Sequence, residues 1–204
     1  MPSIHTTVIR SGNRSERTIP LLQVEKLTVR VGIRRVLEEF DLEVFEGDAV
    51  CLTGPNGSGK STLLNAIAGL EPARVESGRI CFRGDELNNL AAHERARLGI
   101  TYVRQRRNVF EDLTVAENLL TAVGRDGPEL LWARFPAWAE DLPMNKKASV
   151  LSGGQKQRLA WAMAVLRPSV LLLADEPEAG VSERLELPAT PTIVLASHQL
   201  ESWN

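Results

Sequence analysis

The sequence is poor in cysteine, in net charge and in long apolar runs, and each shortage argues against a class of protein. Its two cysteines, Cys51 and Cys81, lie in short apolar runs typical of buried strands, so they favour a reducing cytosol over a disulfide framework. A formal net charge of −2 at pH 7 argues against nucleic acid as a partner. No run approaches the ~18 consecutive apolar residues of a membrane-spanning helix, so any membrane role needs another polypeptide.

Length and composition indicate one soluble domain that follows a polar N-terminal tail. The 204 residues are 43% hydrophobic and 25% charged, which is ordinary for a globular protein. Residues 1–20 are polar and have no apolar core, so they lack the pattern of a secretory signal. We expect a flexible N-terminal tail over residues 1–20 and a folded domain over residues 21–204.

A glycine-rich motif of the form G-x-x-x-x-G-K-[ST] occupies residues 54–61, between an apolar strand pattern and a helical one. Its glycines let backbone N–H groups converge on phosphate oxygens at a helix N-terminus. Lys60 is expected to reach the β- and γ-phosphates, and the Ser61 hydroxyl to ligate Mg²⁺. The predicted nucleotide-binding residues are Gly54, Pro55, Asn56, Gly57, Ser58, Gly59, Lys60, Ser61 and Thr62.

Two carboxylates follow a continuous apolar run at residues 170–174. Such a run suits the centre of a mainly parallel sheet, and the carboxyl ends of its strands face the ligand crevice. Asp175 is therefore placed to reach Mg²⁺ through water. Glu176 is placed to orient or deprotonate an attacking water.

A second glycine pair, at residues 151–155 with the sequence LSGGQ, precedes a helical pattern. Ser152 and two glycines at a helix N-terminus make a further anion site. This segment resembles the signature of the ABC ATPases. The resemblance implies that it caps the γ-phosphate of a nucleotide held by the opposite subunit, through Ser152, Gly153, Gly154 and Gln155.

The resemblance covers the chain from about residue 21 onward and assigns two more residues. Gln105 matches the family glutamine that senses Mg²⁺ and the attacking water, and His198 matches the switch histidine that contacts the γ-phosphate. The implied cofactors are ATP and Mg²⁺. The implied catalytic residues are Glu176, His198, Gln105 and Lys60, and the implied metal-site residues are Ser61, Gln105 and Asp175.

These patterns predict an α/β fold with a P-loop NTPase core and a mainly parallel sheet. Short alternating apolar runs over residues 21–52 indicate an antiparallel β subdomain before the phosphate loop. A mostly helical subdomain is expected as an insertion at about residues 108–150. Its clustered aromatics, Trp132, Phe135 and Trp138, are expected to pack in the core of that subdomain rather than at a partner interface.

The chain departs from the family pattern at three places. Val31 stands where an aromatic residue commonly stacks on adenine. Ser182 stands where an aspartate often communicates across the dimer, although related subfamilies also lack it. Only 23 positions separate Asp175 from His198, and Pro188 and Pro191 fall in that interval, so the helix usually found there is expected to be shortened or missing.

Residues 99–119 resemble importer ATPases of the branched-chain amino-acid type. The resemblance implies two kinds of partner, a second nucleotide-binding domain in a homo- or heterodimer and transmembrane permease subunits. Val109, Phe110 and Leu113 are candidates for the surface that receives a permease helix, and packing inside the subdomain is an equally good interpretation. The implied location is cytoplasmic, peripheral on the inner face of the cell membrane through the permease.

Two alternatives stay open at this level. The chain could be an ABC-type ATPase of a soluble assembly such as the iron–sulfur cluster machinery, whose members share features like residues 76–78 and 94–97. It could also be a degenerate regulatory subunit that binds nucleotide without turnover. The preferred hypothesis is an ATP-hydrolysing subunit that powers an ABC transporter through a head-to-tail nucleotide-sandwich dimer.

Overall fold

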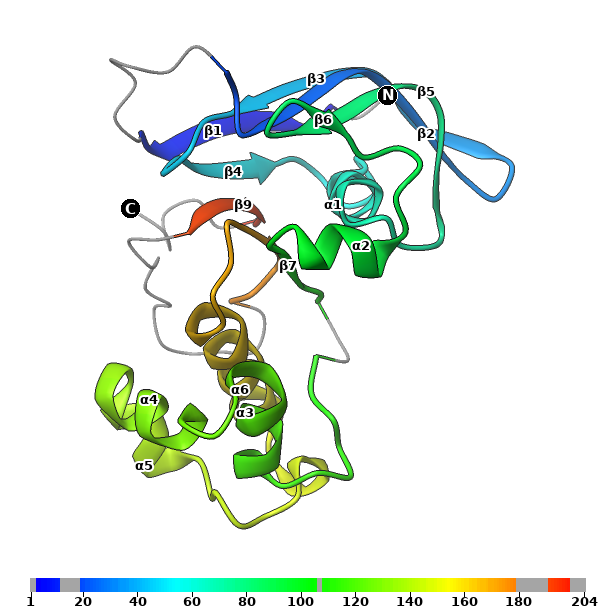
Figure 1. Ribbon diagram of the computed structural model, residues 1–204. Helices are drawn as coiled ribbons and strands as arrows, with labels where there is room; N and C mark the ends of the chain where they lie inside the picture. The colour runs from blue at the N-terminus through cyan, green and yellow to red at the C-terminus, as the bar shows by residue number, and fades with distance from the viewer. Residues whose placement is uncertain (1–2, 12–18, 106–107, 179–190, 199–204) are drawn as a thin grey trace.

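The computed structural model describes residues 3–11, 19–105, 108–178 and 191–198, arranged as two sheets with helices around them (Figure 1). The core sheet has five strands in the order β1-β4-β9-β8-β7. Four of them run parallel, and β1 is antiparallel to β4. These strands are β1 (His5–Arg10), β4 (Ala49–Thr53), β7 (Ile100–Val103), β8 (Leu171–Asp175) and β9 (Thr192–Ala196).

Every residue of β8 and β9 is buried, as the continuous apolar runs predict. The two faces of these strands contribute to different cores. Leu171, Leu173 and Val194 pack with α1 (Lys60–Ala68) and the antiparallel sheet, whereas Leu172 and Leu195 pack with α6 (Gly153–Leu166). The helices α1 and α6 therefore cover opposite faces of the core sheet, which confirms the expected α/β architecture.

The expectation of a flexible tail is wrong for His5–Arg10, which form strand β1 on the edge of the core sheet. Thr6 pairs with Leu52 and Val8 with Val50. The β-branched residues at positions 6–9 favour an extended backbone. The edge of β4 offers unpaired N–H and C=O groups that β1 satisfies, and this tertiary pairing outweighs the polar composition.

The second sheet is antiparallel, in the order β3-β2-β5-β6. Its strands are β2 (Leu22–Val31), β3 (Arg34–Val44), β5 (Ala73–Phe82) and β6 (Asp85–Glu86). Figure 1 shows α1 between this sheet and the core sheet. Leu22, Leu64 and Leu171 belong to one buried cluster, so the helix that follows the phosphate loop is held on both sides.

A buried arginine closes the C-terminal end of α1. Arg95 of helix α2 (Ala92–Arg97) donates from Nη1 to the carbonyl oxygens of Ala66, at 2.7 Å, and Ile67, at 2.9 Å. The last carbonyls of a helix have no partner within the helix, and a cation there also faces the negative end of the helix dipole. Arg95 thus replaces water at a helix end that the fold buries.

Residues 108–150 hold helices, as the sequence indicates. They are α3 (Val115–Val123), α4 (Gly127–Arg134), α5 (Pro136–Asp141) and the short 3₁₀ helix η1 (Ala148–Val150). Trp138 is buried and stacks on Phe135 with ring centroids 4.4 Å apart. Trp132 is 48% exposed, so its expected place in the core is wrong. Its neighbour Leu131 is fully buried, and one helical step of about 100° turns Trp132 away.

Candidate nucleotide-binding and hydrolysis site

The phosphate loop lies between the end of β4 and the start of α1, as its motif predicts. Gly59 has a φ of 104°, and a Cβ there would lie 2.7 Å from Leu37 Cδ2. A Cβ at Gly54, whose φ is 146°, would lie 2.9 Å from the backbone oxygen of Ser3. Only glycine suits both positions. The loop is therefore enclosed by β3 and by the segment that leads into β1.

Lys60 is buried and its ammonium lies within the phosphate loop. Nζ donates to the carbonyl oxygens of Gly54, at 2.7 Å, and Pro55, at 3.2 Å. The hydroxyl of Ser58 is also buried, and it has no hydrogen-bond partner among the described residues. A cation and an unsatisfied hydroxyl beside backbone N–H groups suit a phosphate group, which brings acceptor oxygens and negative charge.

Ser61 and Asp175 meet beside the loop, since Ser61 Oγ donates to Asp175 Oδ1 at 3.0 Å. Asp175 is 5% exposed at the carboxyl end of β8. Burial raises the pKa of Asp175, and the hydrogen bond from Ser61 opposes that shift. In the described residues no three His, Cys, Asp or Glu side chains form a metal cluster. A hydroxyl and one carboxylate fit Mg²⁺, which commonly takes its remaining ligands from waters and phosphates.

Glu176 lies between two side chains that are remote in sequence. Its Oε2 accepts a hydrogen bond from Gln105 Nε2 at 2.6 Å, and its Oε1 lies 2.8 Å from His198 Nε2. The backbone N–H of Glu176 donates to Ala196 of β9 at 2.9 Å. The end of β7, the end of β8 and the end of β9 each supply one member, because parallel strands end at the same edge of a sheet.

The backbone of Glu176 is unusual, with a φ of 46°. Residues other than glycine rarely adopt this left-handed conformation, and it costs on the order of 1–3 kcal/mol at each such residue. Packing and the bond to Ala196 hold it in place. This left-handed conformation turns the chain directly after β8, and the carboxylate of Glu176 then points toward Gln105 and His198.

The signature segment does not join this group of residues. Ser152 is the N-cap of α6: its hydroxyl accepts from the N–H of Gln155 at 3.2 Å, and Gln155 Oε1 accepts from the N–H of Ser152 at 3.0 Å. This reciprocal capping fixes the helix start. Because α6 and α1 cover opposite faces of the core sheet, one chain does not bring its signature to its own phosphate loop.

The sequence did not predict two side chains near the site, those of Tyr102 and Glu178. Tyr102 of β7 lies near Asp175, and burial together with the charge of Asp175 raises the pKa of this phenol. Glu178 lies close to Glu176 and His198. The only available signal was proximity to the strand ends. Ser182 and the expected shortening of the helix before His198 lie outside the described residues.

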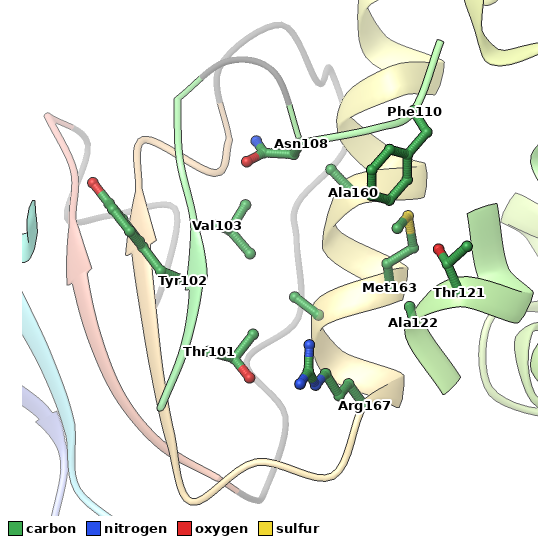
Figure 2. Close-up of a pocket in the computed structure, with 11 residues that line it drawn as sticks. Thr101, Tyr102, Val103, Asn108, Phe110, Thr121, Ala122, Ala160, Met163 and Arg167 are labelled. Atoms are coloured by element: carbon green, nitrogen blue, oxygen red, sulfur yellow. The ribbon is translucent and has the colours of Figure 1, made fainter. Parts of the chain in front are cut away.

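A groove lies on the helical side of the core sheet, between β7, α3 and α6 (Figure 2). Its volume is about 250 Å³. Phe110 is 57% exposed at its rim, and Figure 2 shows its ring over Ala160 and Met163. Val109 packs against the hydrophobic core on the α6 side of the sheet, and Leu113 is half-buried. The groove is lined by Thr101, Tyr102, Val103, Asn108, Phe110, Thr121, Ala122, Ala160, Met163, Ala164 and Arg167.

Comparison with known proteins decides the family. Residues 37–179 match the model of the family described as ABC transporter. The chain belongs to the ABC transporter family. It is an ATP-binding subunit of that family with ATPase activity, and both the predicted fold class and the predicted function are confirmed.

Two curated relatives illustrate the likeness. The chain is 39% identical, over 169 residues, to the probable branched-chain amino acid transport ATP-binding protein LivF of Archaeoglobus fulgidus, with 80% of this chain and 71% of the relative covered. It is 39% identical, over 175 residues, to the Fe(3+) ions import ATP-binding protein FbpC of Streptomyces coelicolor, with 81% of this chain and 49% of the relative covered. The chain thus spans about half the length of the second relative.

Solved structures agree with the fold. One, the cassette MJ1267 of an ABC transporter, superposes with a TM-score of 0.70 at 26% identity and covers 90% of this chain and 83% of its own. Another is the dimeric post-hydrolysis state of the cassette MJ0796 bound to ADP and Pi, with a TM-score of 0.72 at 25% identity and 89% of each chain covered. Within the described residues, no helix is long and apolar enough to span a bilayer.

Proposed function

We propose that Glu176, held between Gln105 and His198, is the group that activates water for ATP hydrolysis in this subunit. The observation that carries the proposal is the convergence of these three side chains at the edge of the sheet beside the phosphate loop. A carboxylate with one oxygen on an amide N–H and the other on an imidazole has a fixed orientation. It can accept a hydrogen bond from water and take up the proton.

The other residues prepare the nucleotide. Lys60 leaves the carbonyl oxygens of Gly54 and Pro55 and binds the β- and γ-phosphates, while the loop N–H groups donate to phosphate oxygens. Mg²⁺, held by Ser61, Asp175 and Gln105, would neutralise phosphate charge during transfer. His198, next to Glu176, contacts the γ-phosphate.

The signature acts on the nucleotide of another subunit. Ser152, Gly153, Gly154 and Gln155 begin α6 on the face of the sheet opposite α1, so a second nucleotide-binding domain must bring them to the phosphates. The dimeric cassette with ADP and Pi to which this chain is similar supports that arrangement. Two domains, in a homo- or heterodimer, then enclose two nucleotides head to tail.

The helical subdomain at about residues 108–150, inserted in the nucleotide-binding domain of residues 21–204, carries the permease contact. The groove rimmed by Phe110 is concave and places the apolar side chains of Met163 and Ala160 beside polar ones such as Arg167, and it suits a short helix of a transmembrane permease. The subunit is thereby peripheral on the cytoplasmic, inner face of the cell membrane. The names of the transport proteins among its relatives support a transporter over a soluble assembly, and the grouping of Glu176, Gln105 and His198 supports turnover over a degenerate subunit.

Nucleotide-dependent assembly tests this function. Glu176→Gln is expected to bind ATP without hydrolysing it, so light scattering should detect a dimer with Mg²⁺ and ATP and a monomer with ADP. The double variant Glu176→Gln, Ser152→Arg should stay monomeric with Mg²⁺ and ATP, because the arginine side chain would occupy the space at the start of α6 that receives the nucleotide of the other subunit. Co-purification of a membrane permease from detergent-solubilised membranes should identify the second partner. A variant that stays monomeric with ATP, or a soluble scaffold as the sole companion, would contradict the proposal.

A further inference from the structure

Glu178 has a carboxylate that the site described above does not use. It lies three residues after Asp175 and is half-buried. Its Oε1 accepts a hydrogen bond from the hydroxyl of Ser197. Its Oε2 is shielded from solvent and has no hydrogen-bond partner among the described residues. The turn before it is fixed as well, since Gln157 Nε2 of α6 donates to the carbonyl oxygen of Pro177 at 3.0 Å.

The partner of Glu178 stands at a sensitive position. Ser197 is fully buried and directly precedes His198. Its backbone N–H donates to the carbonyl oxygen of Leu52 at 3.1 Å, in the strand that leads into the phosphate loop. Ser197 is therefore held by β4 through its backbone and by Glu178 through its side chain. These two bonds fix the point from which the imidazole of His198 extends toward Glu176.

Keeping a carboxylate at this place has a free-energy cost. Burial raises the pKa of Glu178, the hydrogen bond from Ser197 and the charge of His198 lower it, and the charge of Glu176 raises it further. An apolar side chain here would avoid the desolvation of a carboxylate and the repulsion from Glu176. The cost indicates that the hydrogen bond to Ser197 has a role besides packing.

We propose that Glu178 is a positioning residue, which through the Ser197 hydroxyl holds His198 in register with Glu176. The proposal rests on the roles given above to Glu176 and His198. Loss of the bond removes the contact between Glu178 and the Ser197 hydroxyl and leaves the phosphate-binding donors of the phosphate loop untouched. The imidazole then meets Glu176 and the γ-phosphate less often, while ATP still binds.

The test is a double-mutant cycle on ATP hydrolysis by the assembled transporter. Glu178→Ala and Ser197→Ala should each lower kcat about tenfold and leave the KM for ATP within twofold of the parent value. The double variant should be no slower than either single variant, because both remove one interaction. Glu178→Gln should recover most of kcat, since its amide oxygen still accepts from Ser197. Glu140→Ala, an exposed carboxylate of α5, is the matched control and should not change kcat.

Other outcomes overturn the proposal. They are an unchanged kcat for Glu178→Ala, effects that multiply in the double variant, or a Gln variant as slow as the Ala variant. If Glu178→Ala does not fold, Ser197→Ala against Ser197→Thr carries the test, since threonine retains the hydroxyl and should retain kcat. Glu176→Gln is measured in parallel. If it hydrolyses ATP normally, the proposed function fails; if it is inactive and Glu178→Ala is normal, only the role of Glu178 fails.

Discussion

The residues proposed to carry out hydrolysis are held by contacts that the sequence alone predicts only in part. The end of a buried strand pattern predicted Glu176, and the resemblance to the ABC ATPases, read from the order of the motifs along the chain, predicted Gln105 and His198. The positive φ of Glu176, the place of Tyr102 near Asp175 and the hydrogen bond of Glu178 could not be predicted. They depend on the distance between strand ends, which no local pattern encodes.

The two cysteines provide a test at the residue scale. Burial raises the pKa of Cys51 to about 12 and also raises the pKa of Cys81, but Cys51 is buried whereas Cys81 is partly exposed. A thiol reagent can reach only an exposed sulfur, so Cys51 should stay unmodified at pH 8 while Cys81 reacts slowly through its small thiolate fraction. A thiol reagent should titrate one group in the folded protein and two in guanidinium. Cys81→Ser should leave none in the folded protein; a reactive Cys51 there would contradict its burial in β4.

Among the elements, those with a clear local sequence pattern could be predicted, and those that depend on tertiary contacts could not. The continuous apolar runs predicted β8 and β9, and the glycine-rich motif predicted the start of α1. Strand β1 did not, because its polar residues gain order only by pairing with β4. Trp132 was misplaced because the turn of α4 that buries Leu131 directs it outward.

The helix that follows the phosphate loop depends on Arg95, and this contact can be measured. Arg95→Ala removes the charged donor from the buried carbonyl oxygens of Ala66 and Ile67, and the oxygen of Ala66 keeps the backbone N–H of Gly69 at 3.3 Å. The expected loss in free energy of unfolding is about 3 kcal/mol, from the lost hydrogen bonds to a charged group at a buried helix end. Denaturant unfolding measures it. Arg97→Ala, on the exposed side of the same helix, should change the value by less than ~0.5 kcal/mol. Equal effects of the two variants would refute the capping role.

At the scale of the whole molecule, strand β7 connects the groove with the edge of the sheet where Glu176, Gln105 and His198 meet. Tyr102 and Val103 line the groove, and the same strand leads to Gln105 beside Glu176. A permease helix bound at Phe110 would thus contact the chain five positions after Gln105, the residue that donates to Glu176. The sequence pattern made both Phe110 and Val109 candidates for docking. The structure separates them, because Phe110 is exposed whereas Val109 packs against the core.

This arrangement predicts separate losses of docking and nucleotide binding. Phe110→Asp replaces the exposed aromatic ring at the rim of the groove with a charge and should reduce the permease recovered with the subunit at least tenfold. The affinity for ATP should stay within twofold, because the phosphate loop is unchanged. Pull-down from solubilised membranes and nucleotide titration measure the two quantities. Val150→Asp, a substitution at an exposed apolar residue outside the groove lining, is the control. A Phe110 variant that still retains the permease would contradict docking in the groove.

The ATP hydrolysis rate of Glu176→Gln, measured with Mg²⁺ on the assembled transporter, tests the central claim most directly. The substitution keeps the size of the side chain and removes the carboxylate that would take the proton from water. We expect the rate to fall at least a hundredfold, in line with the loss of a general base, with ATP affinity retained. Glu86→Gln, at an exposed carboxylate of β6, should leave the rate unchanged. A Glu176→Gln variant that hydrolyses ATP at the parent rate would contradict the account.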